Sequence, residues 1–209
     1  MRIKVKICGI TRYEDAKVAV NLGVDALGFI FFKNSARNID PSDARTIVSK
    51  LPPFVTKVGV FVNESLSHIN EISQHVGLTA VQLHGDEDAK FCNKLTLPVI
   101  KAFSVKPDSD LLVIQNYSIS AVLLDTWNEK MYGGSGKTFD WYVAKKICKK
   151  YDNVILAGGL GPANLSEALE TVSPYGVDLN SGVEIMPGIK NPVKMRDAVK
   201  IVHNWKKTG

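Results

Sequence analysis

The chain has 209 residues, of which 45% are hydrophobic and 22% charged, and its formal net charge is +5 at pH 7. This composition excludes a disordered chain and a membrane-embedded one. A length below roughly 250 residues indicates one core, and we expect a single domain over residues 1–209. The basic residues are dispersed at helical spacing, which argues against a nucleic-acid partner and leaves a mild positive field that suits an anionic metabolite.

Three cysteines, Cys8, Cys92 and Cys148, are widely spaced and lack any paired metal-ligand pattern. Neither a disulfide framework nor a zinc site is therefore indicated, and a reducing compartment fits best. The first residues lack the apolar stretch of a signal peptide, and no apolar run approaches the roughly 18 residues of a membrane span. We expect a cytoplasmic protein with no membrane partner.

Short apolar or β-branched runs alternate with longer amphipathic segments along the whole chain. The runs predict eight strands, at Ile3–Cys8, Ala26–Phe31, Lys57–Val62, Ala80–Leu83, Val99–Phe103, Ala121–Asp125, Val154–Ala157 and Gly176–Leu179. A helical segment follows each strand, for example Glu14–Leu22, Pro41–Leu51 and Leu66–His75 after the first three.

Residues suited to helix ends flank these three helical segments. Thr11 and Ser65 are predicted N-caps, and Asp40 is a third, because it precedes a proline at the first helical position. Gly23 and Gly77 follow helix ends, where a left-handed backbone favours glycine.

Strict alternation of strand and helix predicts a parallel sheet, and eight such units in this length fit a closed α/β (βα)8 TIM barrel with outer helices. An open doubly wound sheet is the alternative, but no G-x-G-x-x-G pattern follows the first strand. Barrel enzymes place their chemistry on the loops at the carboxyl ends of the strands, so polar residues there are the candidates.

Two such residues are Cys8 and Asp125, at the ends of the first and sixth strands. A thiol and a carboxyl facing the barrel mouth could move a proton onto one atom and off another. Taken alone, Cys8 is also compatible with a small core residue, and Asp125 with a capped loop. After the sixth strand, a long glycine-bearing connection over residues 126–138 predicts a ligand loop or lid, with a plain mobile connection as the alternative.

Glycines follow the seventh and eighth strands, at Gly158, Gly159 and Gly182. They let backbone N–H groups approach a ligand, and a helix start at Ser181 would aim its positive end outward. The last two loops of the barrel therefore predict a phosphate site, with ordinary tight turns as the alternative.

Two further side chains are candidates for substrate contacts. The planar fork of Arg37 in the second loop suits a carboxylate or a phosphate, although loop arginines are often simply solvated. His84, after the fourth strand, fits either a substrate contact or a hydrogen-bonded structural role.

These segments, taken in order, resemble the phosphoribosylanthranilate isomerase family from the first strand to the last loop. The segments that carry the resemblance are Lys6–Thr11, Ser35–Arg37, Gln82–Gly85, Leu124–Asp125, Gly133–Trp141, Ala157–Leu160 and Ser181–Glu184. The chain departs from the family's pattern at Asn180 and at Lys190–Asn191, both beside the predicted phosphate loop.

The resemblance implies an isomerase of the intramolecular oxidoreductase class, which rearranges a phosphorylated small molecule, N-(5'-phosphoribosyl)anthranilate, in tryptophan biosynthesis. It implies no metal and no organic cofactor. Cys8 falls on the general base and Asp125 on the general acid, while Arg37 and Asp178 fall on residues that serve the anthranilate end. The residues implied to hold the phosphate are Gly158, Gly159, Ser181 and Gly182.

Another phosphate-binding barrel enzyme, of the indoleglycerol-phosphate synthase or pentose-phosphate epimerase type, is the nearest alternative. A synthase carries catalytic lysine and glutamate residues and an epimerase a metal cluster, and the sequence offers no convincing set of either. A non-catalytic phosphometabolite-binding domain is a second alternative, against which Cys8 and Asp125 argue together. Both a monomer and a homodimer are compatible with the sequence.

Overall fold

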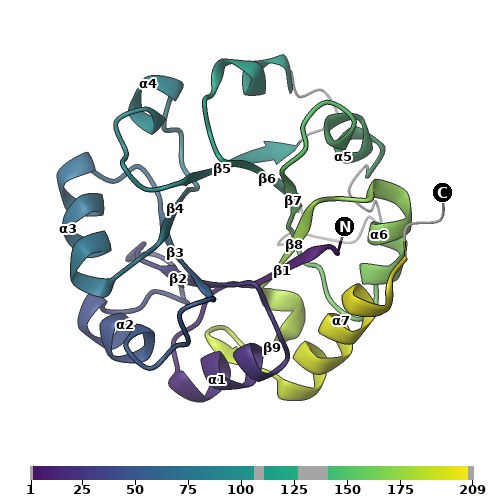
Figure 1. Cartoon of the computed structure of the whole chain (residues 1–209), viewed down its shortest axis with the longest axis horizontal. Helices are drawn as coiled ribbons and strands as arrows, with labels where there is room; N and C mark the ends of the chain where they lie inside the picture. The colour runs from purple at the N-terminus through teal and green to yellow at the C-terminus, as the bar shows by residue number, and fades with distance from the viewer. Residues whose placement is uncertain (1, 106–110, 127–140, 207–209) are drawn as a thin grey trace.

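A closed barrel of eight parallel strands forms the centre of the structure, a computed structural model that describes residues 2–105, 111–126 and 141–206. Each strand pairs with the next, and β8 closes the ring on β1 (Figure 1). The strands are β1 (Lys4–Ile7), β2 (Ala26–Ile30), β3 (Thr56–Phe61), β4 (Ala80–Leu83), β5 (Val99–Val105), β6 (Ala121–Thr126), β7 (Val154–Leu156) and β8 (Gly176–Leu179).

Helices surround the barrel (Figure 1). They are α1 (Tyr13–Asn21), α2 (Pro41–Val48), α3 (Leu66–Val76), α4 (Ala89–Cys92), α5 (Trp141–Cys148), α6 (Leu165–Val172) and α7 (Pro192–Asn204), with the 3-10 helices η1 (Leu111–Asn116) and η2 (Ser181–Val183). Between η2 and α7, a short antiparallel hairpin joins β9 (Glu184–Met186) to β10 (Ile189–Lys190). The described residues after β5 hold only η1 where the sequence predicts a full helix.

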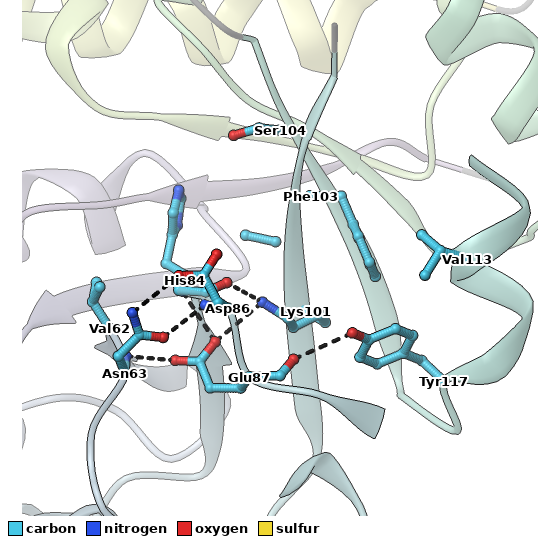
Figure 2. Close-up of a pocket in the computed structure, with 12 residues that line it drawn as sticks. Val62, Asn63, His84, Asp86, Glu87, Lys101, Phe103, Ser104, Val113 and Tyr117 are labelled. Atoms are coloured by element: carbon cyan, nitrogen blue, oxygen red, sulfur yellow. Dashed lines mark hydrogen bonds and ion pairs between the residues drawn. The ribbon is translucent and has the colours of Figure 1, made fainter. Parts of the chain in front are cut away.

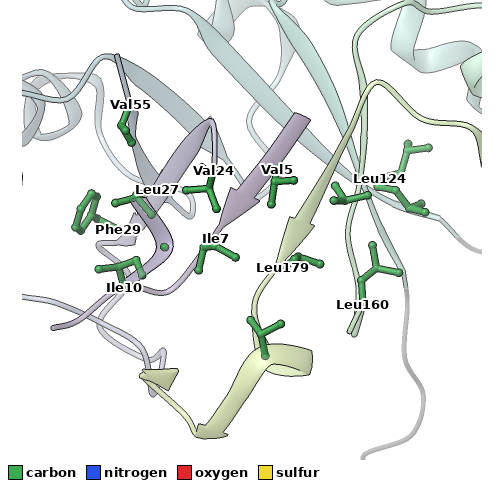
Figure 3. Close-up of a cluster of buried hydrophobic side chains, with 14 of the residues drawn as sticks. Val5, Ile7, Ile10, Val24, Leu27, Phe29, Val55, Leu124, Leu160 and Leu179 are labelled. Carbon is green, nitrogen blue, oxygen red and sulfur yellow. The ribbon is translucent and has the colours of Figure 1, made fainter. Parts of the chain in front are cut away.

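Alternation along the strands divides the core into two parts. In β1, Val5 and Ile7 point outward, and they belong to the large apolar cluster that packs the helices onto the barrel (Figure 3). In β6, Leu124 joins this outer cluster, while Leu123 faces the barrel interior. Because successive side chains of a strand face opposite sides, the residues two beyond an inward one are also inward.

The inward positions change from apolar to polar along the barrel axis. One apolar cluster inside the barrel consists of Val58, Ala80, Ile100, Ala102, Leu123, Ile155 and Ala157. Nearer the carboxyl ends of the strands, alternation turns Lys6, Gln82 and Asp178 inward, and all three are buried. The fold therefore places a polar layer just beneath the mouth of the barrel.

The predicted barrel and its eight strands are confirmed, with strand ends that differ from the predicted ones by at most two residues. The caps predicted at Asp40 and Ser65 are also confirmed, since their side chains accept the backbone N–H of Ser42 and His68. The prediction for Thr11 is wrong, because α1 begins one residue later and the Thr11 hydroxyl donates instead to a distant backbone carbonyl.

The loop predicted to bind ligand, over residues 126–138, lies outside the described residues except for Thr126. None of the helices in the described part of the chain is long and apolar enough to cross a membrane.

Candidate functional site

Cys8 and Asp125 come to the same end of the barrel, as the sequence predicts. Cys8 follows β1 directly, and its backbone N–H donates to the carbonyl of Leu179 at the end of β8, 2.9 Å away. Asp125 lies two residues beyond the inward-facing Leu123, so it also faces the interior, with a side chain that is 33% exposed. Cys8 is buried, whereas Asp125 is open to the mouth.

Cys8 shares its surroundings with a buried ion pair. Lys6 Nζ donates to Asp178 Oδ2 at 2.7 Å, and the two side chains are only 4% and 7% exposed. A Cβ atom on Gly28 of β2 would lie 2.7 Å from Cys8 Sγ and 3.1 Å from Lys6 Nζ, so the thiol and the ammonium converge on this glycine. Any larger residue at position 28 would push them apart.

Burial and the Lys6 ammonium have opposite effects on the pKa of the Cys8 thiol. Burial raises the pKa of Cys8 above its ordinary value, and the Lys6 ammonium acts in the other direction without reversing the shift. Burial also works against the charge of Lys6, but the Asp178 carboxylate outweighs it and raises the pKa of Lys6. Without ligand, Cys8 is therefore a thiol beside a fixed cation.

Asp125 belongs to a chain of three hydrogen-bonding side chains. His84 Nε2 lies 3.0 Å from Asp125 Oδ2, and His84 Nδ1 lies 2.9 Å from Gln82 Nε2. Gln82 is buried, and its Oε1 is a buried atom with no partner among the described residues. The ring of His84 is thus held at both nitrogens, between an amide and the carboxyl.

A second buried ion pair fixes the loop that carries His84. Lys101 Nζ lies 3.1 Å from Glu87 Oε2, and each side chain is 3% exposed. Glu87 also accepts the backbone N–H of Asn63 and of Gly85. Figure 2 shows these contacts beside a cavity of about 490 Å³ that His84 helps to line. The loop after β4 is therefore tied to both neighbouring strands.

The guanidinium of Arg37 is hydrogen-bonded to another side chain of the protein. Its Nε and Nη2 donate to both oxygens of Glu184, at 2.7 to 3.1 Å. Lys190 Nζ, which is fully buried, donates to Glu184 Oε1 at 2.8 Å and to Asn180 Oδ1 at 2.9 Å. Burial works against the charge of Glu184, but the hydrogen bonds from Arg37 and Lys190 lower its pKa below the ordinary value.

The two glycine-bearing turns predicted to bind phosphate meet in space. A Cβ on Gly161 would lie 2.6 Å from the carbonyl oxygen of Gly182, and one on Gly182 would run into the carbonyl of Leu160. Gly158 and Gly159 both have positive φ, at 90° and 63°, and a Cβ on Gly159 would meet nothing within 4 Å. The backbone after β7 therefore packs on η2 and leaves open space at Gly159.

One detail of this region differs from the sequence prediction. The predicted helix start at Ser181 is the short 3-10 helix η2, and Ser181 itself is exposed. Asp178 lies within β8, as the predicted strand Gly176–Leu179 places it, and is buried against Lys6.

Sequence reasoning assigned no role to Lys6, Gln82, Glu184 or Lys190. A signal for the first two was present, because alternation along Lys4-Val5-Lys6-Ile7-Cys8 puts Lys6 on the face of Cys8, and Gln82 is two residues from His84. Glu184 and Lys190 carried no such signal, since a hairpin that follows the last strand brings them to the site.

No group of three or more metal-ligating side chains is close enough to hold an ion within residues 2–105, 111–126 and 141–206.

Comparisons with a family model and with individual proteins point to the same family. The family model of N-(5'-phosphoribosyl)anthranilate isomerase matches residues 5–201. An enzyme of that name from Geotalea uraniireducens is 49% identical over 197 residues, which are 94% of this chain and 97% of the relative.

Two solved structures extend the comparison. A phosphoribosyl anthranilate isomerase in complex with reduced 1-(o-carboxyphenylamino)-1-deoxyribulose 5-phosphate is 41% identical with a TM-score of 0.86, over 96% of this chain and 98% of the other. Monomers generated from the dimeric enzyme of Thermotoga maritima are 40% identical with a TM-score of 0.86, over 96% and 98% of the two chains.

Proposed function

Because the chain belongs to the N-(5'-phosphoribosyl)anthranilate isomerase family, we propose that Cys8 and Asp125 carry the acid–base chemistry of its reaction. The reaction is the Amadori rearrangement of N-(5'-phosphoribosyl)anthranilate to 1-(o-carboxyphenylamino)-1-deoxyribulose 5-phosphate in tryptophan biosynthesis. One observation supports the assignment above all: the two side chains face the same mouth, Cys8 beside a buried ammonium and Asp125 bonded to His84.

The proposed sequence begins at Asp125. In its protonated form it donates to the furanose ring oxygen, the bond from that oxygen to C1' breaks, and a protonated Schiff base forms. Cys8, as thiolate, then removes the hydrogen from C2', and the electron pair moves to the iminium nitrogen. The enolamine gains a proton at C1' and loses the proton of its 2'-hydroxyl, giving the ketone. C1' is reduced and C2' oxidised, so the change is an oxidoreduction within one molecule.

The Cys8 thiolate is the least favourable species in this scheme. Burial holds Cys8 in the thiol form, so an additional positive charge must favour the anion when substrate is bound. The iminium formed at C1' supplies that charge next to the thiol, and Lys6 adds a fixed one. We infer that Cys8 releases its proton to solvent only once the ring has opened, which protects the thiol between turnovers.

Substrate binding is assigned to the remaining predicted residues. We propose that the phosphate lies against backbone N–H groups of Gly158, Gly159, Ser181 and Gly182, in the open space beside Gly159. Arg37 is proposed to orient the anthranilate carboxylate, and the bidentate bond to Glu184 holds its fork in one plane for this purpose. His84 is proposed to hold Asp125, and Asp178 to serve the site through Lys6.

We further propose that residues 1–209 form one domain.

The chain is also proposed to form a homodimer through the amino-terminal face of the barrel. Phe54 is 97% exposed and lies beside a cavity of about 400 Å³ at that face, whose lining includes Val58, Ile100 and Ile155. A second copy would cover this apolar surface. A mass measurement in solution tests the proposal, which predicts a dimer for the wild type and a monomer for Phe54→Ser.

A cytoplasmic location is also proposed, in keeping with a biosynthetic enzyme whose Cys8, Cys92 and Cys148 are all free thiols.

The assignment of the site is tested by separating binding from turnover. The reduced product analogue should bind Cys8→Ser and Asp125→Asn about as tightly as the wild type, while Arg37→Ala should bind it more weakly. Loss of analogue binding in folded Cys8→Ser would place Cys8 in the binding surface and contradict its role as base.

A further inference from the structure

Asn180 has no role in the chemistry proposed above, yet it lies beside the proposed base. In the parallel pairing of β1 with β8, Ile7 is the partner of Leu179, so the residues that follow them, Cys8 and Asn180, are neighbours. The backbone N–H of Cys8 donates to the carbonyl of Leu179, which continues the ladder to this point. Asn180 therefore lies at the end of the barrel where substrate must approach Cys8.

The side chain of Asn180 extends from the end of β8 over the loop that follows β1. A Cβ atom on Gly9 would lie 2.7 Å from Asn180 Oδ1 and 2.9 Å from Arg37 Cδ, so both side chains lie close to this glycine. Gly9 has a φ of 71°, in the left-handed region that favours glycine. The amide of Asn180 is thus a neighbour of Arg37, above the residue that follows Cys8.

A buried ammonium determines which end of the Asn180 amide is free. Lys190 Nζ donates to Asn180 Oδ1 at 2.9 Å, to the Asn180 carbonyl oxygen at 3.4 Å and to Glu184 Oε1 at 2.8 Å. An ammonium can only donate, so the amide atom that it contacts is the oxygen, and the NH₂ group is at the other end. This NH₂ has no hydrogen-bond partner among the described residues and is not one of their buried unpartnered atoms. Its two N–H donors are therefore open to a ligand.

The same ammonium also fixes Arg37. Glu184 joins the two cations, since it accepts from Lys190 and, with both of its oxygens, from Nε and Nη2 of Arg37. Two cations share one carboxylate, so this cluster carries an excess of one positive charge. Lys190 therefore holds two sets of donors, on Asn180 and on Arg37, in a cluster that favours an anion.

We propose that Asn180 is a substrate-contacting residue whose NH₂ donates to the anthranilate carboxylate alongside Arg37, and that Lys190 orients the amide for this contact. The two oxygens of a carboxylate offer about four acceptor sites, and Arg37 already uses its Nε and Nη2 on Glu184, so a second donor is needed beside it. The inference rests on the proposed role of Arg37.

Asn180 is one of the positions at which the chain departs from the family's pattern. The proposed contact is accordingly a property of this chain, and it gives Asn180 a part in selecting a substrate that carries the carboxylate. A sugar hydroxyl or the phosphate would also accept from an NH₂ group, so the test must separate these groups from the carboxylate.

Two analogues of the product make this separation by binding alone. One is reduced 1-(o-carboxyphenylamino)-1-deoxyribulose 5-phosphate, and the other is the same compound without its carboxyl group. Isothermal titration calorimetry gives a dissociation constant for each, and the ratio of the two measures the preference for the carboxylate. Both compounds carry the sugar chain and the phosphate, so effects on those groups cancel in the ratio.

Two substitutions remove the proposed donor in different ways. Asn180→Asp keeps an oxygen for Lys190 and replaces the NH₂ by an acceptor, whereas Asn180→Ala removes the amide. In both variants Lys190 retains Glu184 and the backbone carbonyl of residue 180, so we expect both to fold, which thermal unfolding checks. Each should lower the preference for the carboxylated analogue roughly tenfold or more, the worth of a hydrogen bond to a charged group.

Asn70→Asp is the matched control, because it makes the same change of charge at an exposed position of α3 and should leave the ratio unchanged. A wild-type ratio in either folded Asn180 variant would overturn the inference. Equal losses for both analogues would place the NH₂ on the sugar or the phosphate, and no loss for either would leave it without a ligand. The proposed function fails differently: if Arg37 does not bind the carboxylate, the wild type itself would show no preference between the analogues.

Discussion

Replacing Lys6 by Met should destabilise the protein strongly, because it leaves Asp178 charged inside the barrel. The two side chains are 4% and 7% exposed, and the second oxygen of Asp178 has no partner among the described residues to compensate. Removing one partner of a buried ion pair costs about 3–5 kcal/mol. For a chain of this size, that lowers Tm by roughly 6–20 °C.

The double variant Lys6→Met/Asp178→Leu separates stability from catalysis. It removes both charges and fills a similar volume, so its free energy of unfolding should return to the wild-type value or exceed it by about 1–4 kcal/mol. Its kcat/KM should stay low, however, because the thiol of Cys8 has lost the adjacent ammonium. A loss of roughly tenfold or more corresponds to one unit in the pKa of the thiol.

Chemical denaturation and steady-state kinetics measure both effects. Lys57→Met is the control, since Lys57 is also a buried strand lysine, but its Nζ donates to the carbonyl oxygens of Pro52 and Pro53 and to no carboxylate among the described residues. A stable Lys6→Met, or a double variant that recovers full activity along with stability, would refute the reasoning.

Three further outcomes are expected. Arg37→Ala should lower kcat/KM more than tenfold, since a charge-assisted hydrogen bond is worth roughly 1.5–3 kcal/mol, and steady-state kinetics with an unchanged value would return Arg37 to a purely structural role. The pKa of Glu184 is lowered from 4.5, so its ion pairs should add stability in full above that pH and lose it as the pH falls further. Unfolding curves of Glu184→Gln and wild type should therefore converge in acid, whereas a constant offset contradicts the ionic explanation. Crystals grown with phosphate should hold the anion near Gly159 and Gly182, and an anion bound elsewhere with that space empty counts against the cradle.

The sequence predicts the barrel well because its signal is repeated eight times. Each strand alternates outward apolar residues such as Val5 and Ile7 with inward ones, and each is followed by a helical period. The exact ends of individual helices are harder to predict. Thr11 fails as a cap because its hydroxyl reaches the carbonyl of Gly188, a contact made by a hairpin 177 residues away.

The site is predictable only where chemistry and strand position coincide. Cys8 and Asp125 lie at the ends of predicted strands. The alternation of strands and helices and the barrel topology therefore bring them to the same end of the barrel. The ion pairs of Arg37 with Glu184 and of Lys6 with Asp178 join residues 147 and 172 positions apart, and no local pattern encodes such partners. Arg37 consequently looked free in the sequence, although its Nε and Nη2 already donate to Glu184 in the folded protein.

The most direct test of the mechanism is the kcat of Cys8→Ser and of Asp125→Asn with N-(5'-phosphoribosyl)anthranilate. Both substitutions keep shape, but the serine hydroxyl is hardly ionised near neutrality and the asparagine cannot deliver a proton. With circular dichroism showing both variants folded, each should lose about 10² to 10⁴ in kcat, the usual contribution of a positioned acid or base. Near wild-type kcat in either folded variant would contradict the assignment of that residue.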